Sequence, residues 1–227
     1  MLTVHHLENS RSQRILWLLE ELGVAYEIKR YARDKETSLA PAELQRIHPL
    51  GKSPIITDGD VTVAESGAIV EYLVHKYDVG RLLPADNTPA RLTYTYWLHY
   101  AEGTIMPLMV MSLIMNRIET APMPFFVKPI ARGIVGKVRA SYLGPNLKRN
   151  LAFMEATLEK SEWFCGDELT AADIQMSFPV EAAEVRTDLR NAYPRLGGFL
   201  DRIRALPAYQ VALENGGPYD LLGSSRS

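Results

Sequence analysis

The sequence predicts an α/β domain followed by an all-helical domain. Residues 2–77 alternate short β-prone runs with helical patterns, whereas no convincing strand pattern follows residue 80. Residues 78–89 contain Gly80, Pro84 and Pro89 and show little periodicity, which is typical of a linker. We therefore expect domains at residues 1–80 and 90–215, a linker at residues 78–89, and a Gly-, Pro- and Ser-rich tail at residues 216–227.

The first two strands flank a helix. Residues 2–6 are β-prone, and apolar residues follow at helical spacing from Ile15 to Leu22, where Gly23 ends the helix. Residues 26–31 alternate apolar and charged side chains, as a second strand would. Because a helix connects these strands, we expect them to pair in parallel.

A hairpin and a second helix complete the first domain. A short helix is predicted over residues 42–47, because the residue before Pro49 avoids the helical region. Residues 55–57 and 61–63 are β-prone runs on either side of an Asp-Gly turn, which is a strong hairpin signal. A helix should then run from Ser66 to about Tyr77, with its apolar stripe beginning at Ile69.

The remaining two thirds of the chain show helical patterns. A long helix is predicted over residues 90–118, and three prolines in residues 121–129 should break it. Further helices are predicted over residues 147–158, from Thr170 onward, and over residues 196–204. Thr170 and Asp173 have the spacing of a capping box, to which we assign no chemistry.

Composition excludes several classes of function. The net charge of −2 offers no basic surface to nucleic acid. The single cysteine, Cys165, excludes an intrachain disulfide and a site with several thiolates, and the histidines lack metal-ligand spacing. No signal-peptide pattern is evident, and the apolar segment at residues 105–115 is too short for a membrane span. We expect a cytoplasmic protein with no metal.

The turn between the first strand and the first helix can activate a thiol. Backbone N–H groups at a helix start are unpaired, and the helix dipole lowers the pKa of a nearby thiol from about 8.5 toward roughly 7. A hydroxyl from Ser10 or Ser12 could donate a hydrogen bond to that sulfur and favour the thiolate. The residue types alone favour an ordinary helix cap, because serine is a preferred N-cap residue.

Two further segments could bind a ligand. Ser66 should lie at a helix N-terminus, which suits a carboxylate, and the adjacent Glu65 could pair with an ammonium group. An ordinary helix cap remains the alternative. One apolar helical segment, which contains Met106, Met109, Met111 and Met115, could line a ligand pocket, a core or a dimer contact.

Nearly the whole chain, and most strongly residues 2–77 and 162–178, resembles the glutathione S-transferase superfamily. The similarity is to its cytosolic, serine-type members, in the theta-like group of fungi and bacteria. It implies a thioredoxin-like first domain that binds glutathione as co-substrate, and a helical second domain that shapes the site of a hydrophobic small-molecule electrophile. It also implies a homodimer.

The resemblance assigns the catalytic role to Ser10. In serine-type members the catalytic serine follows the first strand and precedes a helical arginine by four residues, as Ser10 precedes Arg14. Ser12 and Asn9 remain alternatives, because some relatives use an asparagine near this turn.

The resemblance also assigns the glutathione contacts. Ser53 would bind the cysteinyl backbone through its own main chain, next to a cis bond at Pro54, in the manner of strand addition. Lys52 would reach the glycyl carboxylate, and Glu65 and Ser66 would bind the γ-glutamyl end.

The implied reaction is attack of the glutathione thiolate on an electrophilic carbon or a peroxide. Two other functions stay open. One is a glutathione-dependent disulfide-bond reductase, for which Asn9 gives a reason. The other is a non-catalytic protein that binds glutathione or another ligand. In all three readings Cys165 is a buried apolar residue and not a nucleophile.

Overall fold

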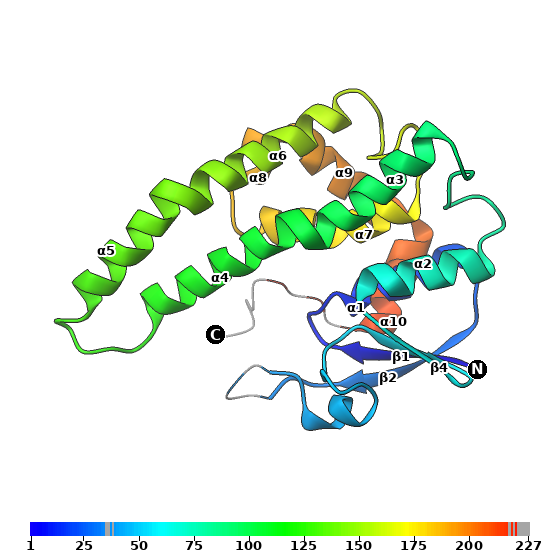
Figure 1. Ribbon diagram of the computed structural model, residues 1–227, viewed down its shortest axis with the longest axis horizontal. Helices are drawn as coiled ribbons and strands as arrows, with labels where there is room; N and C mark the ends of the chain where they lie inside the picture. Colours follow the sequence, from blue (N-terminus) through cyan, green and yellow to red (C-terminus); the bar gives the residue numbers. More distant parts are fainter. Residues whose placement is uncertain (35–36, 38, 218, 220, 222–227) are drawn as a thin grey trace.

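In the computed structural model, residues 1–34, 37, 39–217, 219 and 221 are described, and they form a sheet domain and a helical domain (Figure 1). The strand order in the sheet is β2-β1-β3-β4. The parallel pairing of β1 with β2 is confirmed, and the other neighbours pair antiparallel. The strands are β1 Leu2–Leu7, β2 Tyr26–Tyr31, β3 Ile55–Asp58 and β4 Val61–Ala64.

Two helices from the first domain cover the sheet. They are α1 Ser12–Leu22 and α2 Ser66–Tyr77, and α1 ends as expected at Gly23, whose φ of 65° suits glycine. Residues 42–46 form a 3₁₀ turn, η1 Ala42–Arg46, whose Leu44 packs with Leu7 and Ile55 in a separate small core. The predicted short helix is therefore present with tighter winding than an α-helix.

The helical domain contains two long continuous helices, each interrupted by one π-turn (Figure 1). The first, residues 89–120, matches the predicted long helix and comprises α3, η2 and α4. The second, residues 128–158, extends the helix predicted over residues 147–158 by about five turns. The elements are α3 Pro89–Tyr100, η2 Ala101–Ile105, α4 Met106–Thr120, α5 Lys128–Val138, η3 Arg139–Leu143 and α6 Gly144–Leu158.

Four further helices follow among the described residues, of which α7 packs on α3, α9 packs on α6, and α10 packs on α1. They are α7 Ala171–Glu184, α8 Leu189–Ala192, α9 Pro194–Ala205 and α10 Pro207–Gly216. Helix α7 is almost wholly buried and contacts α1, α2 and α3. Its capping box is present, because the buried Asp173 accepts hydrogen bonds from the Thr170 N–H at 2.9 Å and the Phe164 N–H at 2.7 Å. Burial raises the pKa of the nearby Cys165 thiol to about 12, so this thiol stays protonated.

Helices α5, α8 and α10 do not correspond to any helix predicted from the sequence. Pro129 does not belong to a break, because it occupies the first turn of α5, where its missing N–H costs nothing. Helix α10 has only ten residues, too few to be stable in isolation, and its stability comes from packing on α1. Of the predicted tail at 216–227, residues 218, 220 and 222–227 lie outside the described residues.

The helical run Pro89–Thr120 also has the length and apolar composition of a membrane span. The core helix of a soluble domain has the same properties. Here Tyr94, Trp97 and Ile105 are buried against the rest of the helical domain, and α3 packs along α7. The part of this run through Met109 therefore belongs to the domain core.

Candidate active site

The turn after β1 brings a pair of hydroxyl groups together. The Ser10 hydroxyl oxygen lies 2.8 Å from that of Ser12 and 3.3 Å from that of Ser53. It also accepts a hydrogen bond from the Ser12 N–H at 3.2 Å. Residues 10 and 53 meet because β1 and β3 are adjacent antiparallel strands, so the turn after one lies beside the residues before the other. The Ser10 hydroxyl oxygen therefore accepts a hydrogen bond from the backbone, and its O–H can donate a hydrogen bond to another group.

Ser12 is held inside the fold. It has no exposed surface, and its hydroxyl lies 2.9 Å from His6 Nδ1 and 3.2 Å from the Leu7 carbonyl oxygen. Ser10 lines a cleft and Ser12 does not. Sequence reasoning missed His6, because nothing in a β-strand pattern shows which histidine faces a turn hydroxyl.

His6 stands behind this pair as a neutral side chain. Burial, and next the charge of Arg30, lower the pKa of His6 to about 4, and a hydrogen bond to the Gly216 backbone opposes this shift. Gly216 ends α10, so the missed helix closes over the back of the turn. The side chain behind Ser12 is consequently uncharged at neutral pH.

A cleft of about 940 Å³ opens beside Ser10, between the sheet domain and the helical domain. Asn9, Lys52 and Ser53 line one side, and apolar side chains such as Met109 and Phe178 line the other. A backbone edge thus faces an apolar wall across the cleft. This arrangement suits a peptide on one side and a less polar molecule on the other.

The segment at Ser53 has the expected geometry. The Ser53–Pro54 peptide bond is cis, as predicted, and the Ser53 hydroxyl donates to the His5 carbonyl at 3.3 Å. Gly51 precedes it with a φ of 56°, and a side chain there would collide with Gln45. Since the Ser53 side chain points into the sheet domain, its main chain is left for a ligand.

Glu65 and Ser66 lie in a smaller depression that shares Lys52 and Ser53 with the cleft. Glu65 has a φ of 71°, which is strained for a residue with a side chain and is typical of functional turns. Ser66 begins α2 and is buried, and its hydroxyl accepts a hydrogen bond from Arg14 at 2.5 Å. The Ser66 hydroxyl is therefore already engaged within the chain.

Arg14 connects the two domains. Its guanidinium donates to Ser66, to the Gln175 carbonyl oxygen at 2.6 Å, and to the Glu102 carboxylate. Only 2% of Arg14 is exposed, and burial lowers the pKa of its guanidinium while the charge of Glu102 raises it. Sequence reasoning used Arg14 as a marker of the turn and did not foresee these contacts.

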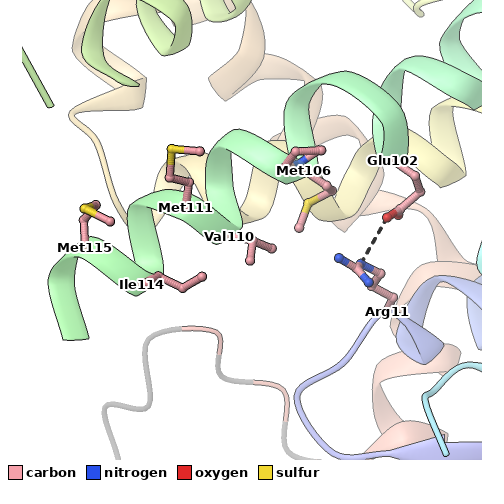
Figure 2. Close-up of a pocket in the computed structure, with 8 residues that line it drawn as sticks. Arg11, Glu102, Met106, Val110, Met111, Ile114 and Met115 are labelled. Carbon is pink, nitrogen blue, oxygen red and sulfur yellow. Dashed lines mark ion pairs between the residues drawn. The ribbon is translucent and has the colours of Figure 1, made fainter. Parts of the chain in front are cut away.

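Glu102 completes this cluster from the π-turn η2. Besides Arg14, its carboxylate pairs with Arg11 at 3.4 Å (Figure 2). Glu102, Arg11 and Arg14 therefore form one ion-pair cluster within a single chain.

The methionine segment has two roles. Met106, Met111 and Met115 line a second cavity of about 550 Å³ along α4, next to Arg11 and Glu102 (Figure 2). Met109 is buried in the core, although its surface also reaches the cleft beside Ser10. Both interpretations of the segment, pocket lining and core, therefore apply to different residues.

Comparisons with known proteins agree on one family. Residues 1–75 match the pattern described as "Glutathione S-transferase, N-terminal domain", and residues 114–207 match the corresponding C-terminal domain. The chain is 38% identical to glutathione S-transferase 3 of Schizosaccharomyces pombe, covering 94% of this chain and 87% of that protein. It is 32% identical to glutathione S-transferase 1 of Saccharomyces cerevisiae, covering 94% of both.

Among solved structures, a glutathione S-transferase from Actinobacillus pleuropneumoniae has a TM-score of 0.79 and 34% identity, covering 100% of this chain and 97% of that one.

We predict that Arg14→Met lowers the free energy of unfolding by about 3 kcal/mol, because it leaves the Glu102 carboxylate and the Gln175 carbonyl without their buried partner. Urea unfolding followed by circular dichroism measures this loss. Arg11→Met is the control, since its pair with Glu102 is more exposed and should be worth less than about 1 kcal/mol. Equal losses in both variants would contradict the special role of Arg14.

The low pKa of His6 predicts an acid-sensitive fold. A histidine with a folded pKa of about 4 and an unfolded pKa of 6.5 binds more protons when unfolded. Its contribution is fully present above pH 6.5 and is lost as the pH falls toward 4, a total of roughly 3 kcal/mol.

The stability advantage of the wild type over His6→Gln should therefore shrink from neutral pH to pH 4. Urea titrations at a series of pH values measure this difference. Exposed His99→Gln serves as the control and should run parallel to the wild type. Parallel curves for His6→Gln as well would show that His6 is not held neutral.

Proposed function

This chain belongs to the glutathione S-transferase family, and we propose that it is a soluble, cytoplasmic enzyme that joins the sulfur of glutathione to an electrophilic small molecule. The observation that carries the proposal is the place of the Ser10 hydroxyl, which lines the cleft between the Ser53 backbone and the apolar wall of α4 and α7. With a single cysteine the chain cannot form an intrachain disulfide, so its fold does not depend on an oxidising compartment, and this fits the cytoplasm.

Ser10 would stabilise the glutathione thiolate. Its oxygen accepts the Ser12 N–H, so its own hydrogen can turn toward the sulfur. The N-terminus of α1 adds partial positive charge at the same point. The thiol proton leaves to solvent, the sulfur lone pair forms the new bond to carbon, and the leaving group departs with its electron pair.

The sheet domain would hold the tripeptide. Ser53 offers its main chain to the cysteinyl residue, and Lys52 offers an ammonium group to the glycyl carboxylate. Glu65 would pair with the γ-glutamyl ammonium. Because Arg14 engages the Ser66 hydroxyl, the γ-glutamyl carboxylate would rely on the unpaired N–H groups at the start of α2, including that of Ser66.

In this proposal residues 1–80 bind glutathione, residues 78–89 are the linker, and residues 90–215 shape the binding site of the electrophile. The two sets of lining residues support it, since the helical domain supplies the apolar wall of the cleft. Asn9 also lines the cleft, which keeps a disulfide-bond reductase as the second candidate.

We predict that Ser10→Ala raises the pKa of bound glutathione by about one to two units, a loss of roughly ten- to a hundredfold in rate near neutral pH. The pH dependence of the thiolate absorbance and of conjugation to chlorodinitrobenzene measures the shift. Glu65→Ala is the matched control, because it should weaken glutathione binding in titration calorimetry and leave the thiol pKa unchanged.

Three results would count against this assignment. An unchanged pH profile in Ser10→Ala would transfer the role to Asn9 or Ser12. Faster turnover of a small disulfide than of chlorodinitrobenzene, lost in Asn9→Ala, would favour the reductase. Tight glutathione binding with neither activity would leave a binding protein.

We further propose that the protein is a homodimer. Leu92 on α3, which is 73% exposed, is one turn from Tyr96, and the Tyr96 ring lies 6.2 Å from that of Phe153 on α6. Tyr96 and Phe153 are each nearly half exposed, so these three residues form an apolar patch on the helical domain. Such a patch is typical of a surface that another subunit covers.

Sedimentation velocity should give a mass of about twice the 25.5 kDa of one chain. Tyr96→Glu should shift the protein to monomer by placing a charge in the patch. Ile130→Glu, at an exposed site on α5, is the control and should leave the mass unchanged. A wild-type protein that sediments as a monomer would refute the dimer.

A further inference from the structure

The cleft beside Ser10 carries an excess of positive charge. Five cationic side chains line it: Arg11, Arg33, Lys52, Arg117 and Arg186. No Asp or Glu is found among the described residues that line it. The whole chain has a net charge of −2, so this cleft departs from the overall balance.

Two of these cations already have a role. Arg11 pairs with Glu102, and Lys52 is assigned to the glycyl end of glutathione. Both also line the depression that holds Glu65 and Ser66. Their charges therefore fit the tripeptide and need no other ligand.

The other three cations do not line that depression. Arg33 follows β2, Arg117 lies near the end of α4, and Arg186 follows α7, so three separate segments place them around one space. Arg117 and Arg186 form no ion pair with any described carboxylate. Burial lowers the pKa of the Arg33 guanidinium, the charge of Glu8 raises it, and the charge of Arg117 lowers it. Arg33 is therefore partly balanced by Glu8, and Arg117 and Arg186 carry the charge that no described carboxylate pairs.

A cleft lined by one sign of charge attracts ligands of the opposite sign. Low-dielectric walls focus its field and raise the local concentration of an anion. Guanidinium groups bind carboxylates in a bidentate fork, which fixes orientation as well as charge. Met106, Val110 and Phe178 line the same space, so the complementary ligand has an apolar body and an anionic substituent.

We propose that the second substrate is an anionic electrophile, an apolar molecule with a carboxylate or similar anion that Arg117 and Arg186 bind. This inference rests on the proposed transferase activity and names its substrate class. The competing explanation is that all five cations serve glutathione, which itself carries two carboxylates. The two explanations differ in which kinetic constant the arginines control.

A chlorodinitrobenzoate and its methyl ester form a matched pair of probes. In both, the glutathione sulfur forms a bond to the ring carbon that carries chlorine, chloride leaves with the bonding electrons, and the thiol proton goes to solvent. Only the charge of the substituent differs. Each enzymatic kcat/KM is compared with the uncatalysed rate of the same probe, which removes the difference in intrinsic reactivity.

We expect the wild type to accelerate the acid at least about tenfold more than the ester. Added salt should reduce this preference, because it screens the cations. Arg117→Gln combined with Arg186→Gln should remove the preference for the acid. In this double variant, the kcat/KM for the ester and the KM for glutathione should stay within about twofold of the wild-type values. Exposed Arg132→Gln on α5 is the matched control and should keep the preference.

Other outcomes overturn the inference. Equal or better acceleration of the ester by the wild type would exclude an anionic substrate class. A rise in the KM for glutathione with both probes in the double variant would assign these arginines to glutathione.

If neither probe reacts, the transferase proposal fails by itself. Calorimetry with the two preformed glutathione conjugates then still tests the anion site. At least about tenfold tighter binding of the acid conjugate, lost in the double variant, supports it, and equal affinities refute it.

Discussion

The buried guanidinium of Arg14 is the interaction on which the candidate site depends. It projects from the first turn of α1, directly after the Ser10 turn, and it contacts Ser66 at the start of α2, the Gln175 carbonyl of α7 and Glu102 of η2. One rigid planar group thus fixes the turn, the depression that contains Glu65 and Ser66, and the helical wall relative to one another. Because the guanidinium is removed from water, any shift of these elements would leave a charge or a carbonyl unpaired, which costs several kcal/mol.

The π-turn at residues 101–105 makes this arrangement possible. A π-turn inserts one residue into a helix and changes the direction of the following side chains, and such turns often occur at functional sites. Here it lies at the point where the long helix passes the first domain, and it carries Glu102 to both Arg11 and Arg14. Beyond it, α4 presents Met106 to the cavity (Figure 2).

Local pattern was sufficient to predict the strands, the parallel pairing of β1 with β2, the hairpin and the capping box at Asp173, because each follows from a short motif or from the connection between two elements. It did not predict that Ser10 meets Ser53, because that contact depends on the pairing of β1 with β3. It was insufficient for α10, whose stability comes from packing on α1. Local pattern also did not predict the contacts of Arg14 and His6. They join residues up to about two hundred positions apart, and no periodicity encodes such pairs.

The charges around Ser10 are arranged asymmetrically. Behind the turn, the support is neutral, since burial lowers the pKa of His6 to about 4 and Ser12 presents only a hydroxyl. In front of it, Arg11 and the more distant arginines of the cleft supply positive charge. An anion at Ser10 would thus be attracted toward the cleft and not into the sheet domain. A charged imidazole behind Ser12 would weaken this preference, so the neutrality of His6 would keep a thiolate bound at Ser10 on the side of the cleft where an electrophile could reach it.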